Sequence, residues 1–120
     1  MIIGVGIDLI KVERIEKALK RKNFLEVTFT KDEIACYRGA GEPIDSLAAK
    51  FAVKEAVFKA LGTGWIKGTD VEVLADTAGK PVVNLYGESL KKSKGLGVNN
   101  IQVSKSYYGD YAVGMAIAER

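Results

Sequence analysis

The sequence has no histidine, only one cysteine and only two prolines among its 120 residues. Without histidine, the chain has no imidazole general base, no serine–histidine catalytic triad and no imidazole metal ligand. With Cys36 alone, it has neither an intramolecular disulfide nor a cysteine cluster for zinc. A metal bound by this chain must therefore be a hard cation held by carboxylate oxygens, for which magnesium is the obvious candidate.

Long apolar runs are also missing. No run is long enough to cross a bilayer, and the first residues lack the basic flank and cleavage site of a secretory signal. We therefore expect a cytoplasmic protein that does not act at a membrane. Because 48% of the residues are hydrophobic and no linker, repeat or low-complexity segment is visible, we expect residues 1–120 to form one globular domain.

The net charge is only +3, but basic residues are concentrated near the N-terminus. Apolar residues recur at helical spacing across residues 11–22, which predicts a short amphipathic helix. Most of its remaining surface is basic: Lys11, Arg14, Lys17, Lys20, Arg21 and Lys22. We interpret this surface as a docking site for an acidic partner. A solvated face balanced by Glu13 and Glu16 is the alternative.

An aspartate lies in the first apolar run, IIGVGIDLI at residues 2–10. Strand alternation places the large apolar side chains on one face, which we expect to be the core: Ile3, Val5, Ile7 and Leu9. The other face carries Gly4, Gly6 and Asp8, and glycine in a strand often marks close approach by a ligand or another backbone. We expect Asp8 to stand over a vacant shelf; capping the next helix or pairing with Arg14 are the alternatives.

Two further helices follow in the first half of the chain. Thr30-Lys31-Asp32-Glu33 has the form of a capping box and begins a helix that Gly39 closes. The longest predicted helix, residues 45–61, buries a stripe made of Leu47, Phe51, Phe58 and Leu61. Glu55 lies at the edge of this apolar stripe, and Lys59, four residues later, can form a surface ion pair with it. Lys54 also projects near the stripe.

The second half is rich in strands. Residues 70–87 are predicted to form two strands joined by a turn at Gly79-Lys80-Pro81, followed by a helix at about 88–94. Residues 101–119 are predicted to form a hairpin that turns near Gly109-Asp110. Antiparallel hairpins with segregated helices indicate an α+β fold, in which an antiparallel sheet packs against the long helix.

Two carboxylates in unusual surroundings, Asp8 and Glu55, are what a two-carboxylate magnesium site requires. Such a site completes its shell with water and substrate phosphate. Lys59, the free amides of the turn at residues 62–64 and Lys80 can supply the phosphate side. The two turns also have simpler interpretations: Gly-Thr-Gly after a helix is usually a C-cap, and Gly-Lys-Pro between strands is usually a hairpin turn.

Four motifs occur in order along the chain: GIDLI with Asp8, KFAVKEAVFKALGTG from Lys50 to Gly64, GKP from Gly79 to Pro81, and VSKS at residues 103–106. With these motifs the sequence resembles the holo-acyl-carrier-protein synthase family, the small bacterial 4′-phosphopantetheinyl transferases, along essentially its full length. The resemblance implies a 4′-phosphopantetheinyl transferase-like fold. It also implies transfer of the phosphopantetheine arm of coenzyme A to a serine of apo acyl carrier protein, with magnesium and release of adenosine 3′,5′-bisphosphate.

The resemblance also implies roles for individual residues. Asp8 and Glu55 hold the magnesium, and Lys59 neutralises the phosphates or assists the leaving group. The groups that face the nucleotide are Lys50, where the family usually has arginine, together with Gly62, Thr63, Gly64, Gly79, Lys80, Pro81 and Ser104. Arg14 and Arg21 dock the acidic carrier protein. A homotrimer with active sites between neighbouring subunits is implied as well.

The chain departs from the family at Tyr107, where a histidine commonly follows the VSxS segment. Tyrosine cannot become cationic, so Lys105 or Lys80 is left to hold the 3′-phosphate. Because histidine is absent, we expect Glu55 to accept the proton of the attacking serine, directly or through water. The alternatives from other classes are a small basic nucleic-acid-binding domain that uses the first helix, and a non-enzymatic interaction domain in which both carboxylates form ion pairs.

Overall fold

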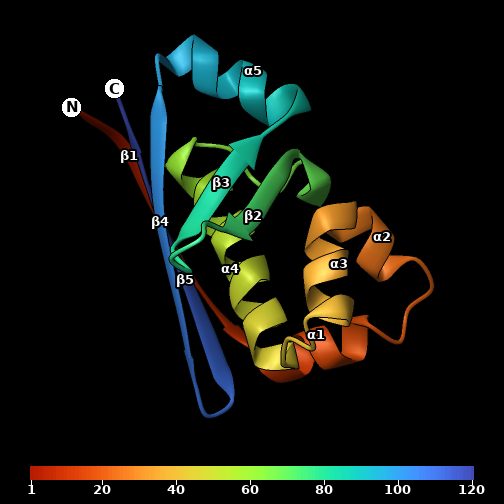
Figure 1. The fold of residues 1–120 in the computed structure, drawn as a ribbon. Coiled ribbons are helices and arrows are strands. Elements are labelled where there is room, and N and C mark those ends of the chain that lie inside the picture. Colours follow the sequence, from red (N-terminus) through yellow and green to blue (C-terminus); the bar gives the residue numbers. More distant parts are fainter.

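The computed structural model describes residues 1–120 and contains two antiparallel sheets (Figure 1). The strands are β1 (Ile2–Lys11), β2 (Val71–Ala75), β3 (Pro81–Leu85), β4 (Asn100–Tyr108) and β5 (Tyr111–Glu119). The helices are α1 (Val12–Ala18), α2 (Phe24–Thr28), α3 (Lys31–Gly39), α4 (Ile44–Ala60) and α5 (Gly87–Leu96), with a short 3-10 helix η1 (Gly68–Asp70). The sheets have the orders β1-β5-β4 and β2-β3, which confirms the α+β class. None of the helices combines the length and apolarity needed to span a membrane.

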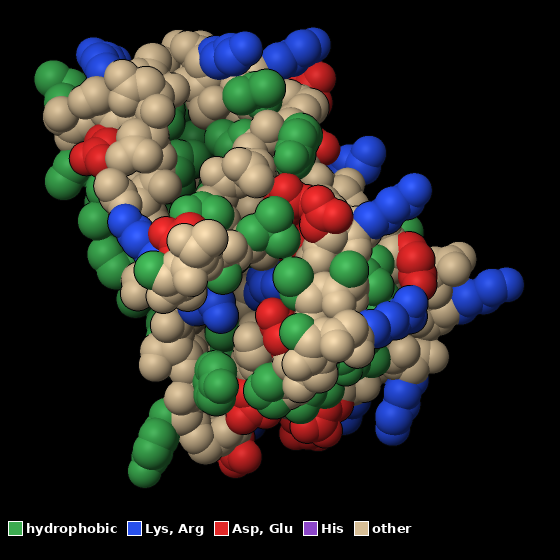
Figure 2. Space-filling view, viewed as in Figure 1, with side chains coloured by type: hydrophobic (Ala, Val, Ile, Leu, Met, Phe, Trp, Pro, Cys, Tyr) green, Lys and Arg blue, Asp and Glu red, His purple; other side chains and the backbone are tan.

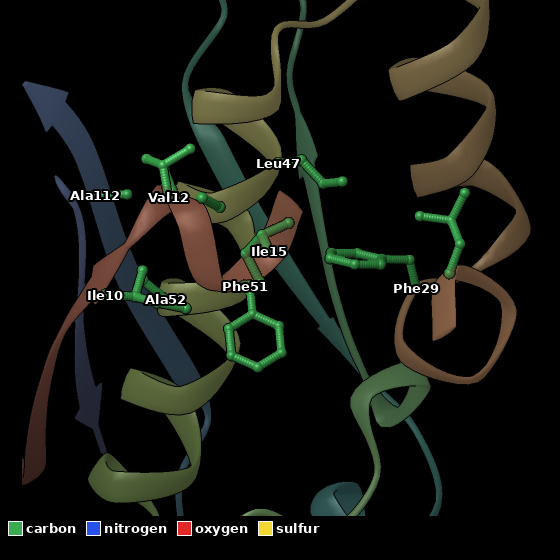
Figure 3. Close-up of a cluster of buried hydrophobic side chains, with 11 residues drawn as sticks. Ile10, Val12, Ile15, Phe29, Leu47, Phe51, Ala52 and Ala112 are labelled. Carbon is green, nitrogen blue, oxygen red and sulfur yellow. The ribbon is translucent and has the colours of Figure 1, made fainter. Parts of the chain in front are cut away.

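Helix α4 is the centre of the fold, and 13 of its 17 residues are buried. The predicted buried stripe is confirmed, because Leu47, Phe51, Phe58 and Leu61 are all at most 6% exposed. The N-terminal half of α4 packs into a cluster with residues of β1, α1 and α2, and the C-terminal half packs against β2, β4 and β5. Figure 3 shows the first cluster, in which Ile10, Val12 and Ile15 lie around the helix that carries Phe51.

The three-stranded sheet meets α4 through a face that is almost without side chains. A Cβ added to Gly4 would overlap the carbonyl oxygen of Ala60, and one added to Gly6 would overlap that of Ala56. The expectation of a vacant shelf beside Asp8 is therefore wrong, since the helix backbone fills this space. Glycine marks close approach here, but by another segment of the chain.

The opposite, outer face of this sheet is apolar and uncovered. Val5, Ile7 and Leu9 are 57%, 62% and 66% exposed, so their predicted place in the core is wrong. They lie opposite three further apolar residues of β5: Ile117, Met115 and Val113. Figure 1 shows the helices on the other side of the sheet only. The alternation of large and small side chains distinguishes the two faces of β1 but does not say which face is buried. Here the face with the small residues is buried, because it lets the helix backbone approach.

The close helix–sheet contact predicts a strong penalty for adding a single methyl group. We expect Gly6→Ala to lower the free energy of unfolding by about 1–3 kcal/mol, because the helix must move away from the sheet. Gly39→Ala is the matched control, since no atom lies within 4 Å of the added Cβ at that position. Urea denaturation monitored by circular dichroism measures both variants. Equal stability of Gly6→Ala and the parent chain would contradict the close contact.

Local helix signals were predicted well, apart from one short helix. The capping box of α3 is confirmed: Glu33 N–H donates to the Thr30 hydroxyl, and Thr30 N–H donates to the Glu33 carboxylate at 2.9 Å. The two hairpins and α5 are also present. However, α1 ends at Ala18 and a separate helix α2 follows at Phe24–Thr28; Asn23, the residue before α2, has a left-handed conformation with φ of 64°.

Candidate functional site

Asp8 and Glu55 lie close together where β1 meets α4. Their side chains are 11% and 22% exposed, respectively. Burial raises the pKa of Glu55, and the neighbouring negative charge of Asp8 raises this pKa further. Oxygen Oδ2 of Asp8 is buried and has no hydrogen-bond partner. Two carboxylates that repel each other and an unsatisfied carboxylate oxygen favour a cation at this place.

Each carboxylate has one exposed basic neighbour. Lys59 Nζ lies 3.1 Å from Asp8 Oδ1 and also donates to the carbonyl of Ile7, while Arg14 Nη2 lies 3.7 Å from Glu55 Oε1. The expected pair between Lys59 and Glu55 is therefore replaced by one between Lys59 and Asp8. Asp8 neither pairs with Arg14 nor caps α1. Because both cations are more than half exposed, these ion pairs add little stability.

The donor set fits a hard divalent cation such as Mg²⁺. Only carboxylate oxygens are offered, and no group of three or more Asp, Glu or Cys side chains converges anywhere in the chain. Two protein carboxylates leave the other positions of an octahedral shell to water and substrate oxygens, as magnesium prefers beside phosphates. Asp8 and Glu55 would hold the ion, and we call these two residues and Lys59 the acidic centre.

A second charged group lies on the other side of α4. Lys50 is five residues before Glu55, which rotates it by about 140° around the helix axis. Its side chain is only 4% exposed, and its Nζ lies 3.7 Å from Glu42 Oε2. Lys105 of β4 is half-buried beside it: burial lowers the pKa of Lys105, and the charge of Lys50 lowers it further. We call Lys50 and Lys105 the lysine pair.

Helix α4 separates the acidic centre from the lysine pair. Asp8 of β1 and Lys105 of β4 flank the same residue of β5, Gly114, from its two sides. A Cβ added to Gly114 would overlap the backbone of Ala52 and Val53, so the helix lies directly on the sheet at this point. Within a single chain, the backbone of α4 therefore lies between the two groups.

The Gly-Thr-Gly turn after α4 acts mainly as a helix cap. Gly62 has φ of 76°, its N–H donates to Lys59, and the N–H of Thr63 donates to Phe58. The Thr63 hydroxyl also donates to the Phe58 carbonyl. The expectation that the amides of Gly62 and Thr63 are free for an anion is therefore wrong. The amide of Gly64 is not used by the cap.

The remaining nucleotide candidates lie on the β4 side of the fold. Asp76 shapes the β2–β3 turn by accepting the backbone N–H groups of Ala78 and Lys80, and Pro81 begins β3. The side chain of Lys80 is exposed. Ser104 pairs with Met115 on the outer face of the sheet, so a single chain does not bring Ser104 and Lys50 together.

A group of aromatic rings adjoins the acidic centre. The guanidinium of Arg14 lies 5.4 Å from the ring centre of Phe51, and that of Arg21 lies 5.5 Å from the ring centre of Phe24. Trp65, which is 43% exposed, stacks on Phe51 with 4.9 Å between ring centres. Figure 2 shows further basic side chains at the right-hand edge, around α2, α3 and the segment between α1 and α2. Arg14 thus lies between the acidic centre and these aromatic rings.

Sequence reasoning left Lys54 without a role, and the structure provides one. Lys54 is fully buried and donates to Glu33 Oε1 at 2.7 Å and to the carbonyls of Gly68 and Val71. Glu33 also accepts the N–H of Val73. This network connects α3, α4, η1 and β2 behind the acidic centre. The partners are far apart in sequence, so no spacing pattern pointed to the pair. Glu42 and Trp65 were missed for the same reason.

Comparison with known proteins gives the class of this chain. A family model described as the 4′-phosphopantetheinyl transferase superfamily matches residues 4–116. The chain belongs to this superfamily.

Named relatives narrow the class. The chain is 42% identical to a holo-[acyl-carrier-protein] synthase of Clostridium tetani, over 99% of this chain and 97% of the relative. Its fold is similar to the crystal structure of a holo-[acyl-carrier-protein] synthase from Neisseria meningitidis, with a TM-score of 0.88, 31% identity and full coverage of both chains. It is also similar to a holo-(acyl-carrier-protein) synthase from Bacillus anthracis in complex with CoA (3′,5′-ADP), with a TM-score of 0.79, 32% identity and coverage of 98% and 96%. These matches confirm the resemblance and the fold class inferred from the sequence.

Proposed function

We propose that this chain is a holo-acyl-carrier-protein synthase, which transfers the 4′-phosphopantetheine arm of coenzyme A to a serine of apo acyl carrier protein. The observation that carries the proposal is the paired carboxylates Asp8 and Glu55, with an unsatisfied oxygen beside Lys59, in a chain of this superfamily. The relative bound to CoA supports the donor substrate. The relatives give no support to the nucleic-acid-binding alternative.

The acidic centre suits in-line transfer at the β-phosphorus of coenzyme A. The serine oxygen forms a bond to this phosphorus while the bond to the bridging oxygen breaks, and adenosine 3′,5′-bisphosphate leaves. Bound magnesium supplies charge neutralisation on the pyrophosphate oxygens. Asp8 and Glu55 would hold that ion, and Lys59 would stabilise negative charge on the leaving oxygen.

We assign the serine proton to Glu55. Asp8 Oδ1 already accepts a hydrogen bond from Lys59 at 3.1 Å, whereas Arg14, the cation nearest Glu55, is 3.7 Å away and beyond hydrogen-bond distance. Glu55 is therefore the carboxylate with no hydrogen-bonded cation to compete for a proton. It accepts the proton either directly from the serine hydroxyl or through one water.

We further propose a homotrimer with active sites between subunits. Two features support an interfacial site: α4 separates the acidic centre from the lysine pair, and the outer sheet face is apolar and uncovered. A neighbouring subunit that covers this face can bring its lysine pair to the acidic centre of the first. The number of three subunits rests on the family resemblance.

Mixing two inactive variants tests the shared site. Glu55→Gln removes one half of the site and Lys50→Met removes the other, so each variant alone should be inactive. When the two are unfolded and refolded together, random assembly should restore about a quarter of the sites, because those sites receive both intact halves. Transfer rate at limiting coenzyme A measures the recovery. If the mixture stays inactive, the site lies within one subunit.

The carrier protein is proposed to dock on α1 and the segment that follows it. Arg14 and Arg21 are exposed there and lie over aromatic rings next to the acidic centre. Acidic carrier proteins complement this basic surface. We propose that residues 1–120 act as one domain in the cytoplasm, where a single unpaired cysteine is the expected pattern.

Intact-mass spectrometry tests the proposed reaction. The chain is incubated with coenzyme A, Mg²⁺ and an apo acyl carrier protein, and the carrier should gain the mass of one phosphopantetheine arm. A carrier whose acceptor serine is replaced by alanine should gain nothing, and so should the complete mixture with a chelator added. No mass gain in the complete mixture contradicts the proposed function.

A further inference from the structure

The acidic centre and its two basic neighbours form a set of four charges that balance. Asp8 and Glu55 carry the negative charges, and Lys59 and Arg14 carry the positive charges at 3.1 Å and 3.7 Å from them. A divalent cation that joins this set leaves an excess of two positive charges at close range, which costs free energy in a partly buried place. Binding of the ion is therefore easier when one of the two basic side chains moves away.

The two basic side chains are held unequally. Lys59 donates to Asp8 Oδ1 at 3.1 Å and to a backbone carbonyl oxygen of β1 at 2.9 Å, so two hydrogen bonds fix it. Arg14 forms no hydrogen bond with Glu55, because the 3.7 Å contact is too long, and 62% of its side chain is exposed. Its other contact is with the ring of Phe51, 5.4 Å from the ring centre. Arg14 is thus the cation that can leave at the lower cost.

Arg14 also belongs to the surface that is proposed to dock the carrier protein. Of the two basic residues of α1, only Arg14 lies within 4 Å of a carboxylate of the acidic centre, whereas Lys17 pairs with Glu13. An acidic side chain of a docked carrier attracts the same guanidinium that Glu55 attracts. One side chain therefore connects the docking surface to the acidic centre.

We propose that Arg14 is a displaceable counter-ion of Glu55, and that a docked acidic carrier protein tightens the binding of the divalent cation by taking Arg14 away. This inference rests on the proposed function for both the ion and the carrier. Rotation of the arginine side chain is enough to exchange one carboxylate for another, so α1 need not move. Because coupling between two binding sites is reciprocal, the bound ion tightens carrier docking by the same factor. The metal site is thus completed preferentially on chains that already hold an acceptor.

Binding of Mn²⁺ to the full chain, without coenzyme A or carrier, tests the counter-ion role. Mn²⁺ takes the same carboxylate ligands as magnesium, and electron paramagnetic resonance measures its free concentration. Arg14→Met should lower the dissociation constant of Mn²⁺ by about fivefold, the upper end of the range for an exposed ion pair. Lys17→Met is the matched control, because it removes an exposed positive charge from the same helix. It should change the constant by less than about twofold, since this charge faces Glu13 and water.

A carrier protein that cannot be modified tests the coupling. An apo acyl carrier protein whose acceptor serine is replaced by alanine is added at saturating concentration, and the Mn²⁺ bound by the carrier alone is measured separately and subtracted. In the parent chain this carrier should tighten Mn²⁺ binding by about as much as Arg14→Met does. In the Arg14→Met chain it should add nothing, because the competing charge is already gone.

The outcomes separate this inference from the proposed function. The counter-ion role is overturned by an unchanged Mn²⁺ constant in Arg14→Met, by an equal change in Lys17→Met, or by the absence of Mn²⁺ binding from every chain. It is also overturned if saturating carrier leaves the constant of the parent chain unchanged. A chain that shows the coupling but transfers no arm to the carrier contradicts the proposed function only. Normal transfer without the coupling contradicts the counter-ion role only.

Discussion

Glu55→Gln is expected to reduce magnesium-dependent transfer by a factor on the order of 10²–10³ while the fold stays intact. The change keeps the size of the side chain but removes both the charge proposed to bind the metal and the proposed proton acceptor. In the absence of metal it also removes the repulsion between Glu55 and Asp8, which raises the pKa of Glu55. The thermal midpoint without magnesium should therefore stay the same or rise slightly. Loss of activity without loss of stability indicates a functional role.

Two further variants interpret this result. Asp8→Asn should cause a similar loss of transfer, because the same ion loses its other protein ligand. Glu13→Gln is the control: Glu13 is an exposed acid of α1 that pairs with Lys17, away from the acidic centre. Near-normal transfer by Glu55→Gln would argue against the assigned role. A large fall in the thermal midpoint of this variant would also argue against it, because unfolding would then explain the lost activity.

Lys54→Met is expected to give the largest loss of stability, about 3–5 kcal/mol. Lys54 and Glu33 are both fully buried, so removal of the lysine leaves a carboxylate without its counter-ion in the protein interior. Burial lowers the pKa of Lys54, and the charge of Glu33 opposes this effect. For a chain of this size the thermal midpoint should fall by roughly 10–20 °C.

A second substitution tests whether charge causes this loss. In the Lys54→Met background, Glu33→Gln should restore part of the lost stability, because the uncompensated charge disappears while an oxygen acceptor remains. Lys91→Met is the exposed control, since its pair with Glu88 on α5 is open to water. Differential scanning calorimetry measures all four chains. If the double variant is no more stable than the single one, loss of packing rather than charge explains the effect.

The sequence predicted which segments form helices and strands better than it predicted which face of each segment is buried. The capping box at Thr30, the long helix and both hairpins follow local rules, so they were found. The buried face of β1 was assigned wrongly because Gly4 and Gly6 contact a helix some 50 residues away, which no local pattern encodes. The carboxylates Asp8 and Glu55 were found because each is a charge within an apolar segment. The roles proposed for them stay predictions.

Charged partners that come from distant segments could not be predicted. Lys54 was noticed as misplaced, but Glu33 appeared only as part of a helix cap. Glu42 and Lys105 look like ordinary surface residues in the sequence, and only the packing of α4 on β4 and β5 gives them a shared environment. The free amides expected at Gly62 and Thr63 were a wrong inference, because the simpler C-cap geometry uses them.

The direct contact of the α4 backbone with Gly4 and Gly6 has a consequence for catalysis. Main-chain atoms, which have no rotamers to adjust, fix how the strand that bears Asp8 lies against the helix that bears Glu55. Folding therefore holds two mutually repelling groups in place before any ligand arrives. The proposed divalent ion would therefore find its two carboxylate ligands already preorganised, and little of its binding energy would be spent on rearranging them.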